Sequence, residues 1–169
     1  MSEVFETMER YAHRLANLVQ RSDACPLFLR IWLLRLCLPG ISRKAVVLSG
    51  THFLDGTIAI GDHAFVNRNC LLECAGGIVI GDHTHLAFGV SLITSTHDTG
   101  TSERRCGPVV FRPVQIGPGA WLGANVIVLP GVTIGPGAVI AAGSVVKDDI
   151  PPNCLAAGNP AVVKRQLPA

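Results

Sequence analysis

The chain has few aromatic and few charged side chains. Aromatic residues make up 5% of its 169 residues and charged residues 15%. A compact globular core normally contains aromatic bulk, whereas a core of stacked aliphatic layers needs little of it. The 18 glycines and the hydrophobic fraction of 49% fit the second kind of core. The composition therefore favours a β-solenoid over a helix bundle or a β-sandwich.

Other missing features exclude several partners and locations. The formal net charge is only +2, and no basic stripe is interleaved with aromatic residues, so nucleic-acid binding is not expected. The N-terminus is acidic and lacks the basic region of a secretory signal, which predicts a cytoplasmic protein. The most apolar run, residues 27–38, contains two arginines and is shorter than the roughly 20 residues that span a bilayer.

The cysteines form no CxxC pair and show no metal-ligand spacing. This pattern predicts reduced, mostly buried thiols in a reducing compartment, and no metal site. Cys70 is expected to pack as a small core residue. The six cysteines are Cys25, Cys37, Cys70, Cys74, Cys106 and Cys154.

An aliphatic residue recurs every six positions along most of the chain. Period six fits neither an amphipathic helix nor a simple alternating strand. It fits a triangular coil of three short strands, in which about 18 residues close one turn and successive turns stack about 4.8 Å apart. We predict a parallel β-helix of about five coils over residues 58–151. The repeating residues are Ile60, Val66, Leu72 and Ile78, then Ile80, Leu86 and Leu92, then Ile116, Leu122, Val128, Ile134, Ile140 and Val146.

Two segments interrupt or precede the repeat. Residues 96–113 are polar and lack the repeating aliphatic residue, which predicts a loop extruded from the coil wall, near 97–113, and such loops often carry function. Residues 1–40 are predicted to form an N-terminal helical segment, and residues 41–169 the β-helix domain with its C-terminal tail.

Two helices are expected in the N-terminal segment, over residues 2–22 and 27–38. The second helix either packs across the end of the coil, which a solenoid must cover, or associates weakly with a membrane surface; capping is the preferred interpretation. The first helix carries an apolar stripe of Phe5, Met8, Ala12, Leu15, Leu18 and Val19.

One histidine, His97, lies where the coil breaks into the extruded loop. The chain has no Gly-x-Ser-x-Gly elbow, no phosphate-binding loop and no dinucleotide fingerprint. A neutral imidazole is suited to removing a hydroxyl proton near neutral pH. Attack of the activated hydroxyl on a thioester then needs no covalent enzyme intermediate, provided that a backbone N–H or a fixed dipole stabilises the oxyanion.

Three stretches resemble the hexapeptide-repeat acyltransferase superfamily, especially the O-acetyltransferases for galactosides, maltose and exopolysaccharides. They are THD at 96–98, PVQIGPGAWLGANVIVLPGVTIGPGAVIAAGSVV at 113–146 and KDDIPPNCLAAGNPAVVKR at 147–165. The resemblance covers residues 56–165. It implies a left-handed coil, a handedness that the periodicity alone does not supply. It also implies a homotrimer that uses acetyl-CoA as a co-substrate and holds no permanently bound cofactor.

The resemblance also implies roles for particular residues. His97 corresponds to the general base, Asn67 to an acceptor contact and Trp121 to a residue beside the cleft. Asp98 either orients His97 or caps the loop turn, and Trp121 either lines the cleft or packs in a subunit interface. In the family the coenzyme lies between adjacent subunits, against small residues and near basic ones. The matching positions here are Gly123, Ala124, Ala142, Gly143, Lys147, Lys164 and Arg165.

The sequence therefore predicts an O-acetyltransferase that moves an acetyl group from acetyl-CoA to a hydroxyl of a sugar, a glycan intermediate or another small hydroxylated acceptor. One alternative is acetylation of an antibiotic or natural-product hydroxyl. Another is a non-catalytic β-helix scaffold, which has no need of His97 at the coil break. A zinc-dependent carbonic anhydrase would need three converging histidines, and His97 has no partner histidine five residues away.

Overall fold

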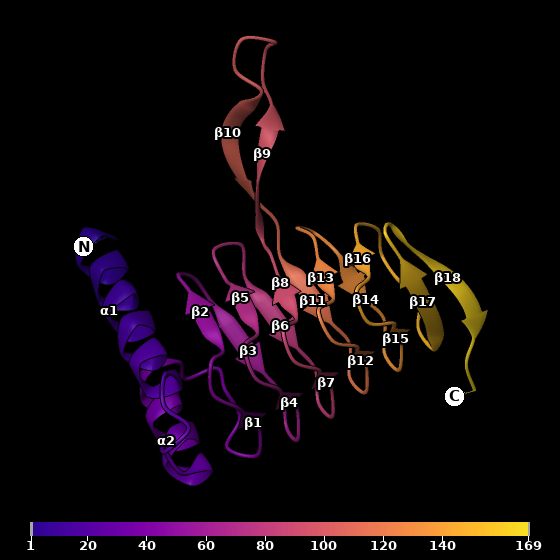
Figure 1. Ribbon diagram of the computed structural model, residues 1–169. Coiled ribbons are helices and arrows are strands. Elements are labelled where there is room, and N and C mark those ends of the chain that lie inside the picture. The colour runs from indigo at the N-terminus through magenta and orange to yellow at the C-terminus, as the bar shows by residue number, and fades with distance from the viewer. Residues whose placement is uncertain (1, 169) are drawn as a thin grey trace.

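The computed structural model describes residues 2–168, with side chains described from Tyr11 onward. Its body is a parallel β-helix, with two helices at the N-terminal end and one hairpin projecting from the side (Figure 1). The predicted fold class, a left-handed parallel β-helix, is confirmed. No helix in the described part of the chain is both long and apolar enough to cross a bilayer.

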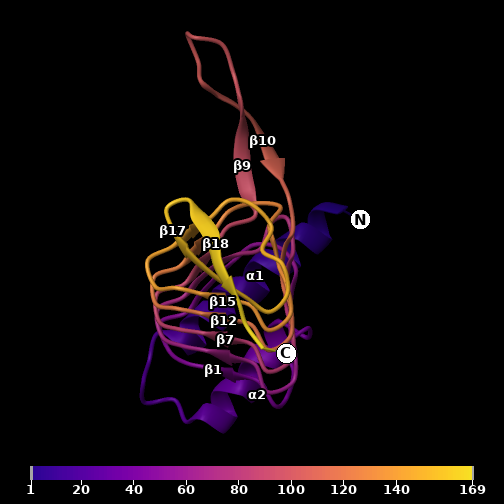
Figure 2. The same ribbon diagram turned by 90° about the vertical axis from the view of Figure 1, so that its right-hand side faces the viewer.

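The β-helix has three faces, each a parallel sheet that runs the length of the prism. Face 1 contains β3 (Ile58–Ile60), β6 (Ile78–Ile80), β11 (Val114–Ile116) and β14 (Thr133–Ile134). Face 2 contains β1 (Val46–Val47), β4 (Phe65–Val66), β7 (His85–Leu86), β12 (Trp121–Leu122), β15 (Val139–Ile140) and β17 (Cys154–Gly158). Face 3 contains β2 (His52–Leu54), β5 (Leu71–Glu73), β8 (Ser91–Leu92), β13 (Ile127–Val128) and β16 (Val145–Val146). An antiparallel strand, β18 (Ala161–Gln166), pairs with β17 and ends face 2 (Figure 2).

The core is a stack of mostly aliphatic side chains, one or two from each strand of the three faces, in register from coil to coil. On face 1, for example, Ile60 pairs with Ile80, Ile80 with Ile116 and Ile116 with Ile134. All four are at most 2% exposed. Successive side chains point to opposite sides of a strand, so a short strand can bury one or two aliphatic residues and still leave their neighbour outside. The six-residue repeat is therefore confirmed as the repeat of the core.

The β-helix is longer at its N-terminal end than the repeat indicated. It begins at Ile41, which forms a parallel bridge with Ile60, and face 2 contains six parallel strands rather than the expected five. The additional coil has its own period of six, in which Ile41, Val47 and Phe53 are all buried.

The prism has three corners, named here by the faces that they join. Corner 2–3 turns in every coil through one residue with positive φ, a conformation that glycine and asparagine adopt most readily. Corner 3–1 is the place where the extruded segment leaves the wall. The positive-φ residues of corner 2–3 are Gly50, Asn69, Gly89, Asn125 and Gly143.

The extruded segment is a β-hairpin rather than an irregular loop. Its strands are β9 (Ser95–Thr99) and β10 (Cys106–Phe111), which pair antiparallel and extend away from the prism (Figures 1 and 2). The predicted position is confirmed, and the antiparallel pairing adds order because each strand satisfies backbone groups of the other.

Both N-terminal helices cover the first coil, so the capping interpretation is confirmed. Helix α1 (Ser2–Gln20) packs through buried His13, Ala16 and Gln20, while the described apolar residues Leu15 and Leu18 are each 55% exposed. The apolar stripe therefore faces outward where it is described; Phe5 and Met8 lie outside the described side chains. The amide of Asn17 pairs with both the N–H and the carbonyl of Phe53, at 2.9 and 2.8 Å.

Helix α2 (Leu27–Cys37) buries Ile31 and Leu34 toward the coil. Arg30 is also buried, at 3% exposure, and its guanidinium donates to the carbonyls of the turn between the two helices and to the side chain of Gln20. This satisfied buried charge fixes α2 against the end of α1.

Candidate active site

His97 lies on β9, exposed on the hairpin, and its ring is held by the opposite strand. Nδ1 is 2.8 Å from the carbonyl oxygen of Gly107. A carbonyl can only accept a hydrogen bond, so Nδ1 carries the proton and donates it, which leaves Nε2 with a free lone pair. The hairpin therefore presents His97 in the tautomer and orientation of a general base.

Asp98 is exposed beside His97 on the same strand. Consecutive side chains of a strand point to opposite faces, and the structure gives Asp98 no hydrogen bond to His97 within the described residues. The carbonyl of Gly107 fills the orienting role that the sequence offered to Asp98. This partner is a backbone group brought opposite by the hairpin register, in which His97 pairs with Val109.

The base of the hairpin is anchored by Glu73, one coil earlier, which sequence reasoning did not select. Its Oε2 accepts hydrogen bonds from the N–H of Thr94 at 2.7 Å, the hydroxyl of Thr94 at 2.9 Å and the N–H of Ser95 at 2.8 Å. Partial burial acts to raise the pKa of Glu73, but the hydrogen bonds from Thr94, Ala75 and Ser95 outweigh it and hold the pKa below its ordinary value. The ionised carboxylate thus fixes the chain two residues before His97.

We expect Glu73→Gln to destabilise the protein by about 1 to 3 kcal/mol at pH 7, because the hydrogen bonds lose their charged acceptor. Since the folded pKa lies below the ordinary value of 4.5, this contribution is complete above about pH 4.5 and is lost as pH falls through the folded pKa. Unfolding measurements from pH 7 downward should show a difference between the variant and wild type that is full near neutral pH and disappears in acid, once Glu73 of the folded wild type is protonated. Glu103→Gln, at the exposed hairpin tip, is the matched control; an equal effect there would contradict the role of Glu73.

The small residues assigned to the coenzyme lie together on corner 2–3. Gly123 and Ala124 occupy one coil, and Ala142 and Gly143 occupy the same corner of the next. The N–H of Gly143 donates to the carbonyl of Ala124 at 2.8 Å, so the two turns are in register. Because no large side chain projects from these positions, the main chain of this corner is accessible to a ligand.

The other predicted residues divide between corners. Asn67 lies on corner 2–3, three coils before Ala142, and Trp121 points outward from face 2 at 54% exposure. Lys164 and Arg165 are exposed on β18, at the end of face 2. Lys147 instead lies on corner 3–1 and forms an ion pair with Asp148 at 2.6 Å.

A single chain therefore does not bring the whole predicted site together. His97 leaves the prism at corner 3–1 on the hairpin, whereas Asn67 and the small residues lie at corner 2–3, on the far side of face 3 (Figures 1 and 2). Exposed apolar residues accompany both groups: Val109 and Phe111 on the hairpin, and Phe88 and Trp121 near corner 2–3.

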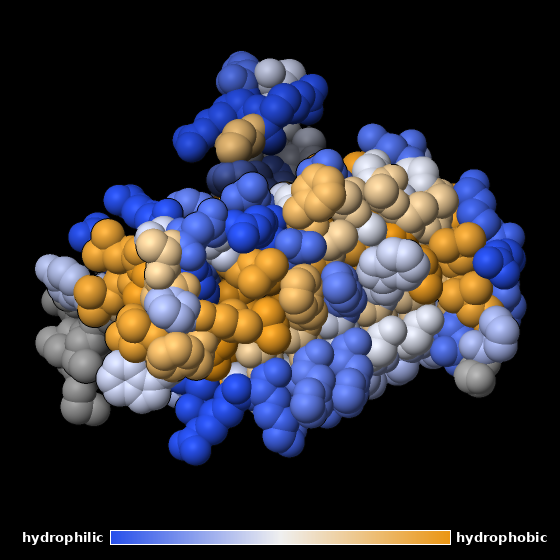
Figure 3. Space-filling view, turned by 60° about the horizontal axis from the view of Figure 1, so that its bottom comes forward, coloured by the Kyte–Doolittle hydropathy of each residue, from blue (hydrophilic) through white to orange (hydrophobic). Residues whose placement is uncertain are grey.

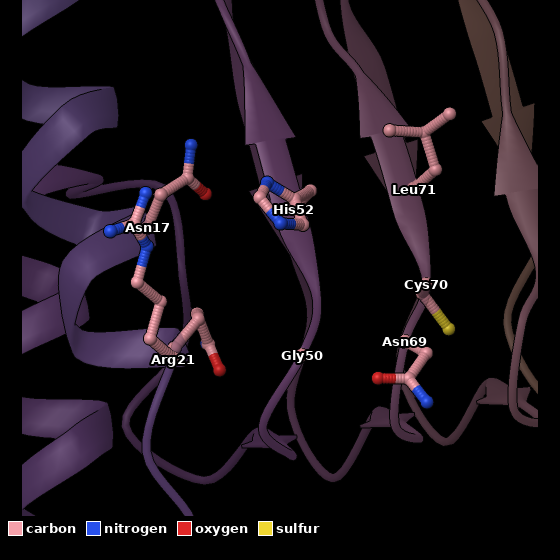
Figure 4. Close-up of a pocket in the computed structure, with 8 residues that line it drawn as sticks. Asn17, Arg21, Gly50, His52, Asn69, Cys70 and Leu71 are labelled. Atoms are coloured by element: carbon pink, nitrogen blue, oxygen red, sulfur yellow. The ribbon is translucent and has the colours of Figure 1, made fainter.

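A cavity of about 400 Å³ lies between α1 and the first two coils, at corner 2–3, and it is lined by Asn69 rather than by Asn67. Figure 4 shows Asn17 of α1 and Arg21, just after the end of this helix, near His52 of β2, with Asn69 and Cys70 on the next coil. The Nε2 atom of Gln20, which also lines the cavity, is buried and has no hydrogen-bond partner among the described residues. The side chains of Asn17, His52 and Asn69 place polar groups in a lining that is otherwise mostly apolar, as in many sites for small molecules.

The described residues form no group of three or more His, Cys, Asp or Glu side chains that could hold a metal ion. The thiols are free; Cys70, Cys74 and Cys154 are buried, while Cys106 is exposed on the hairpin. Burial raises the pKa of Cys70 to about 11, and burial together with the charge of Glu73 raises that of Cys74 to about 12.

Comparison with known proteins matches this architecture to one family. Residues 113–148 match the family described as bacterial transferase hexapeptide (six repeats). Nodulation protein L of Rhizobium meliloti (strain 1021) is 44% identical over 107 residues, which cover 63% of this chain and 58% of that protein. The chain spans little more than half the length of the curated relatives that it matches first.

Solved structures are similar over almost the whole chain. A maltose O-acetyltransferase from Clostridium difficile 630 is 32% identical with a TM-score of 0.82, over 98% of this chain and 89% of that one. A hexapeptide-repeat acetyltransferase from Vibrio cholerae O1 biovar eltor, complexed with acetyl-coenzyme A, is 34% identical with a TM-score of 0.86, over 97% and 89%. A galactoside acetyltransferase in complex with coenzyme A is 31% identical with a TM-score of 0.86, over 96% and 82%. The chain belongs to the hexapeptide-repeat acyltransferase superfamily.

Proposed function

We propose that the protein transfers an acetyl group from acetyl-CoA to a hydroxyl of a sugar, a glycan intermediate or another small hydroxylated acceptor. The observation that carries this proposal is the exposed His97, whose Nδ1 is committed to the carbonyl of Gly107 so that Nε2 is free to accept a proton. The complexes of related acetyltransferases with acetyl-CoA and coenzyme A support the donor, and the maltose and galactoside enzymes support the class of acceptor.

The reaction is a direct transfer. Nε2 of His97 removes the proton of the acceptor hydroxyl as its oxygen attacks the carbonyl carbon of the thioester. The tetrahedral intermediate then collapses, the carbon–sulfur bond breaks, and the imidazolium returns the proton to the departing coenzyme sulfur. A backbone N–H must stabilise the oxyanion of the intermediate, since no metal is required by this route.

The coenzyme would lie along corner 2–3, against Gly123, Ala124, Ala142 and Gly143. A Cβ added at Gly143 would meet no atom within 4 Å, which indicates open space outside this turn. Lys164 and Arg165 are exposed near the same end of the prism and would contact the coenzyme phosphates. The acceptor would lie at corner 2–3, near the cavity beside α1, with Asn67, Trp121 and Asp98 near the reacting groups.

The complete site would require a trimer. Three prisms packed around a threefold axis would place corner 3–1 of one chain beside corner 2–3 of the next, which joins His97 to the neighbour's small residues. Exposed Val109 and Phe111 on the hairpin and exposed Phe88 and Trp121 near the other corner are consistent with such a contact, because apolar patches tend to be buried. Lys147 would then reach the coenzyme from the hairpin's chain. The cytoplasmic location inferred from the sequence stays a prediction.

Release of coenzyme A tests the function directly. With acetyl-CoA and a panel of hydroxylated sugars and natural products, thiol release should depend on the acceptor and yield an O-acetyl ester. Acetyl-CoA alone should leave no acetyl group on the protein by intact-mass measurement, because the buried thiols of Cys70 and Cys74 stay protonated. Cys106→Ser should keep the activity. A stoichiometric adduct, or loss of activity in Cys106→Ser, would contradict direct transfer.

A further inference from the structure

Helix α2 exposes a row of large apolar side chains on its outer surface. Phe28, Trp32 and Leu36 follow one another at successive turns and are 78%, 57% and 66% exposed; we call these three residues the α2 ridge. The opposite side of the helix is buried on the first coil through Ile31 and Leu34. A helix that is apolar on all sides is normally covered on all sides, so the ridge calls for a partner.

The ridge belongs to a wider apolar surface at this end of the molecule. Helix α1 adds exposed Tyr11, Leu15 and Leu18. Figure 3 shows apolar side chains gathered at the end of the molecule that carries the N-terminal helices, with hydrophilic side chains along their borders. The α2 ridge shares no residue with the hairpin or with the cavity beside α1, so it is distinct from the predicted acetyl-transfer site.

Positive charge borders the ridge. Residues 11–44 contain six arginines and lysines but one acidic residue, Asp23, which pairs with Arg68. Of the six, Arg30 is buried and Lys44 pairs with Asp62, so the charge near the ridge comes from Arg35 and Arg43. Arg35 and Arg43 line one groove of about 540 Å³ together with all three ridge residues. Arg35 is held there by a hydrogen bond from Nε to the carbonyl of Ile41 at 2.9 Å. Two guanidinium groups therefore lie directly beside exposed Trp32.

The combination of an apolar ridge with cationic borders distinguishes between the partners that could bind this surface. A second copy packed ridge to ridge would bring the arginines of both chains together, and like charges oppose such a contact. An anionic bilayer matches both features: apolar side chains enter the boundary between headgroups and acyl chains, and arginines bind lipid phosphates. Helix α2 has only 11 residues, which suits a helix that lies in the surface rather than one that spans it.

We propose that the outer face of α2 docks the protein on an anionic membrane surface, with the α2 ridge inserted and Arg35 and Arg43 on lipid phosphates. This inference rests on the N-terminal cap and holds whether or not the protein transfers acetyl groups. It goes beyond the proposed reaction by placing the molecule at a lipid surface.

Sedimentation with vesicles tests this proposal. Wild type should bind vesicles of phosphatidylglycerol and phosphatidylcholine, bind less at high salt, and bind vesicles of phosphatidylcholine alone at least tenfold more weakly. The variant Phe28→Ser/Trp32→Ser/Leu36→Ser should lose at least tenfold in binding, and Arg43→Gln about fivefold. Arg104→Gln/Arg105→Gln, which removes two exposed charges at the hairpin tip, is the control and should bind as wild type does.

Fluorescence gives a second readout. The chain has two tryptophans, so in Trp121→Phe the emission of Trp32 should shift to the blue when anionic vesicles are added. Unfolding curves matching wild type would show that the serine variant is folded. Three results would overturn the proposal: equal binding to neutral vesicles, undiminished binding of the serine variant, or a dimer in wild type that the serine variant lacks.

Discussion

We expect His97→Ala to lower kcat by about 10² to 10⁴-fold, while the Kd for acetyl-CoA stays near that of wild type. The imidazole is the group that would remove the proton of the acceptor hydroxyl. Its Nδ1 is bonded to the carbonyl of Gly107, and among the residues with described side chains none forms a hydrogen bond with Nε2. The small residues proposed to hold the coenzyme lie on another corner, so truncation of His97 should leave donor binding unchanged.

Steady-state kinetics and calorimetric titration with acetyl-CoA would separate the two effects. His63→Asn is a matched control: His63 is an exposed histidine on corner 1–2 with a φ of 57°, which asparagine also tolerates. This variant should keep the activity of wild type. Activity of His97→Ala within tenfold of wild type would rule out His97 as the general base.

Much of the fold could be predicted because each coil repeats the same physical environment. Ile116, Leu122 and Val128 stack in register on the residues of neighbouring coils, so the same requirement returns every six positions. The first coil was missed although Ile41, Val47 and Phe53 keep the same spacing. The spacing of six breaks after this coil, because the next repeating residue is Ile60, seven positions after Phe53. One coil of repeat next to two helical segments is a weak indication of a β-helix.

The surroundings of His97 could not be predicted from its sequence neighbours. Its partner is the carbonyl of Gly107, a backbone group that any residue would supply, and the hairpin register alone brings it opposite. Glu73 is 21 residues from Thr94 in sequence, yet the coil places the two side chains in contact. The feature of the sequence that could have pointed to Glu73 was its position one coil before the break in the repeat.

The side of α1 that packs on the first coil could not be predicted from the sequence for a related reason. Strand β2 pairs with β5 on one side only, so the backbone of Phe53 lacks a strand on the other side, where Asn17 supplies the missing donor and acceptor. The helix therefore turns a partly polar side toward the coil and leaves Leu15 and Leu18 outside. Backbone groups at an open edge need partners, and this need outweighed the apolar pattern.

Mixed oligomers should reveal that each site draws on two chains. We expect His97→Ala and Ala142→Trp to be inactive separately, the first for lack of the base and the second because a large side chain at the exposed Ala142 blocks the coenzyme groove. After the two variants are unfolded and refolded together, a site is intact when its hairpin comes from the Ala142→Trp chain and its corner from the His97→Ala chain. Random assembly into trimers makes about one quarter of the sites intact.

A matched mixture distinguishes this arrangement from a site within one chain. The double variant His97→Ala/Ala142→Trp, refolded with an equal amount of wild type, contains the same substitutions in the same proportion. If each site uses two chains, this mixture also retains about one quarter of the activity, because both chains at a site must be wild type. If each site lies within one chain, the double-variant mixture retains about one half and the mixture of single variants none. Activity of about one quarter in both mixtures therefore establishes the shared site. No recovery of activity from the mixed single variants would contradict it, and so would light scattering that shows the fully active enzyme to be a monomer.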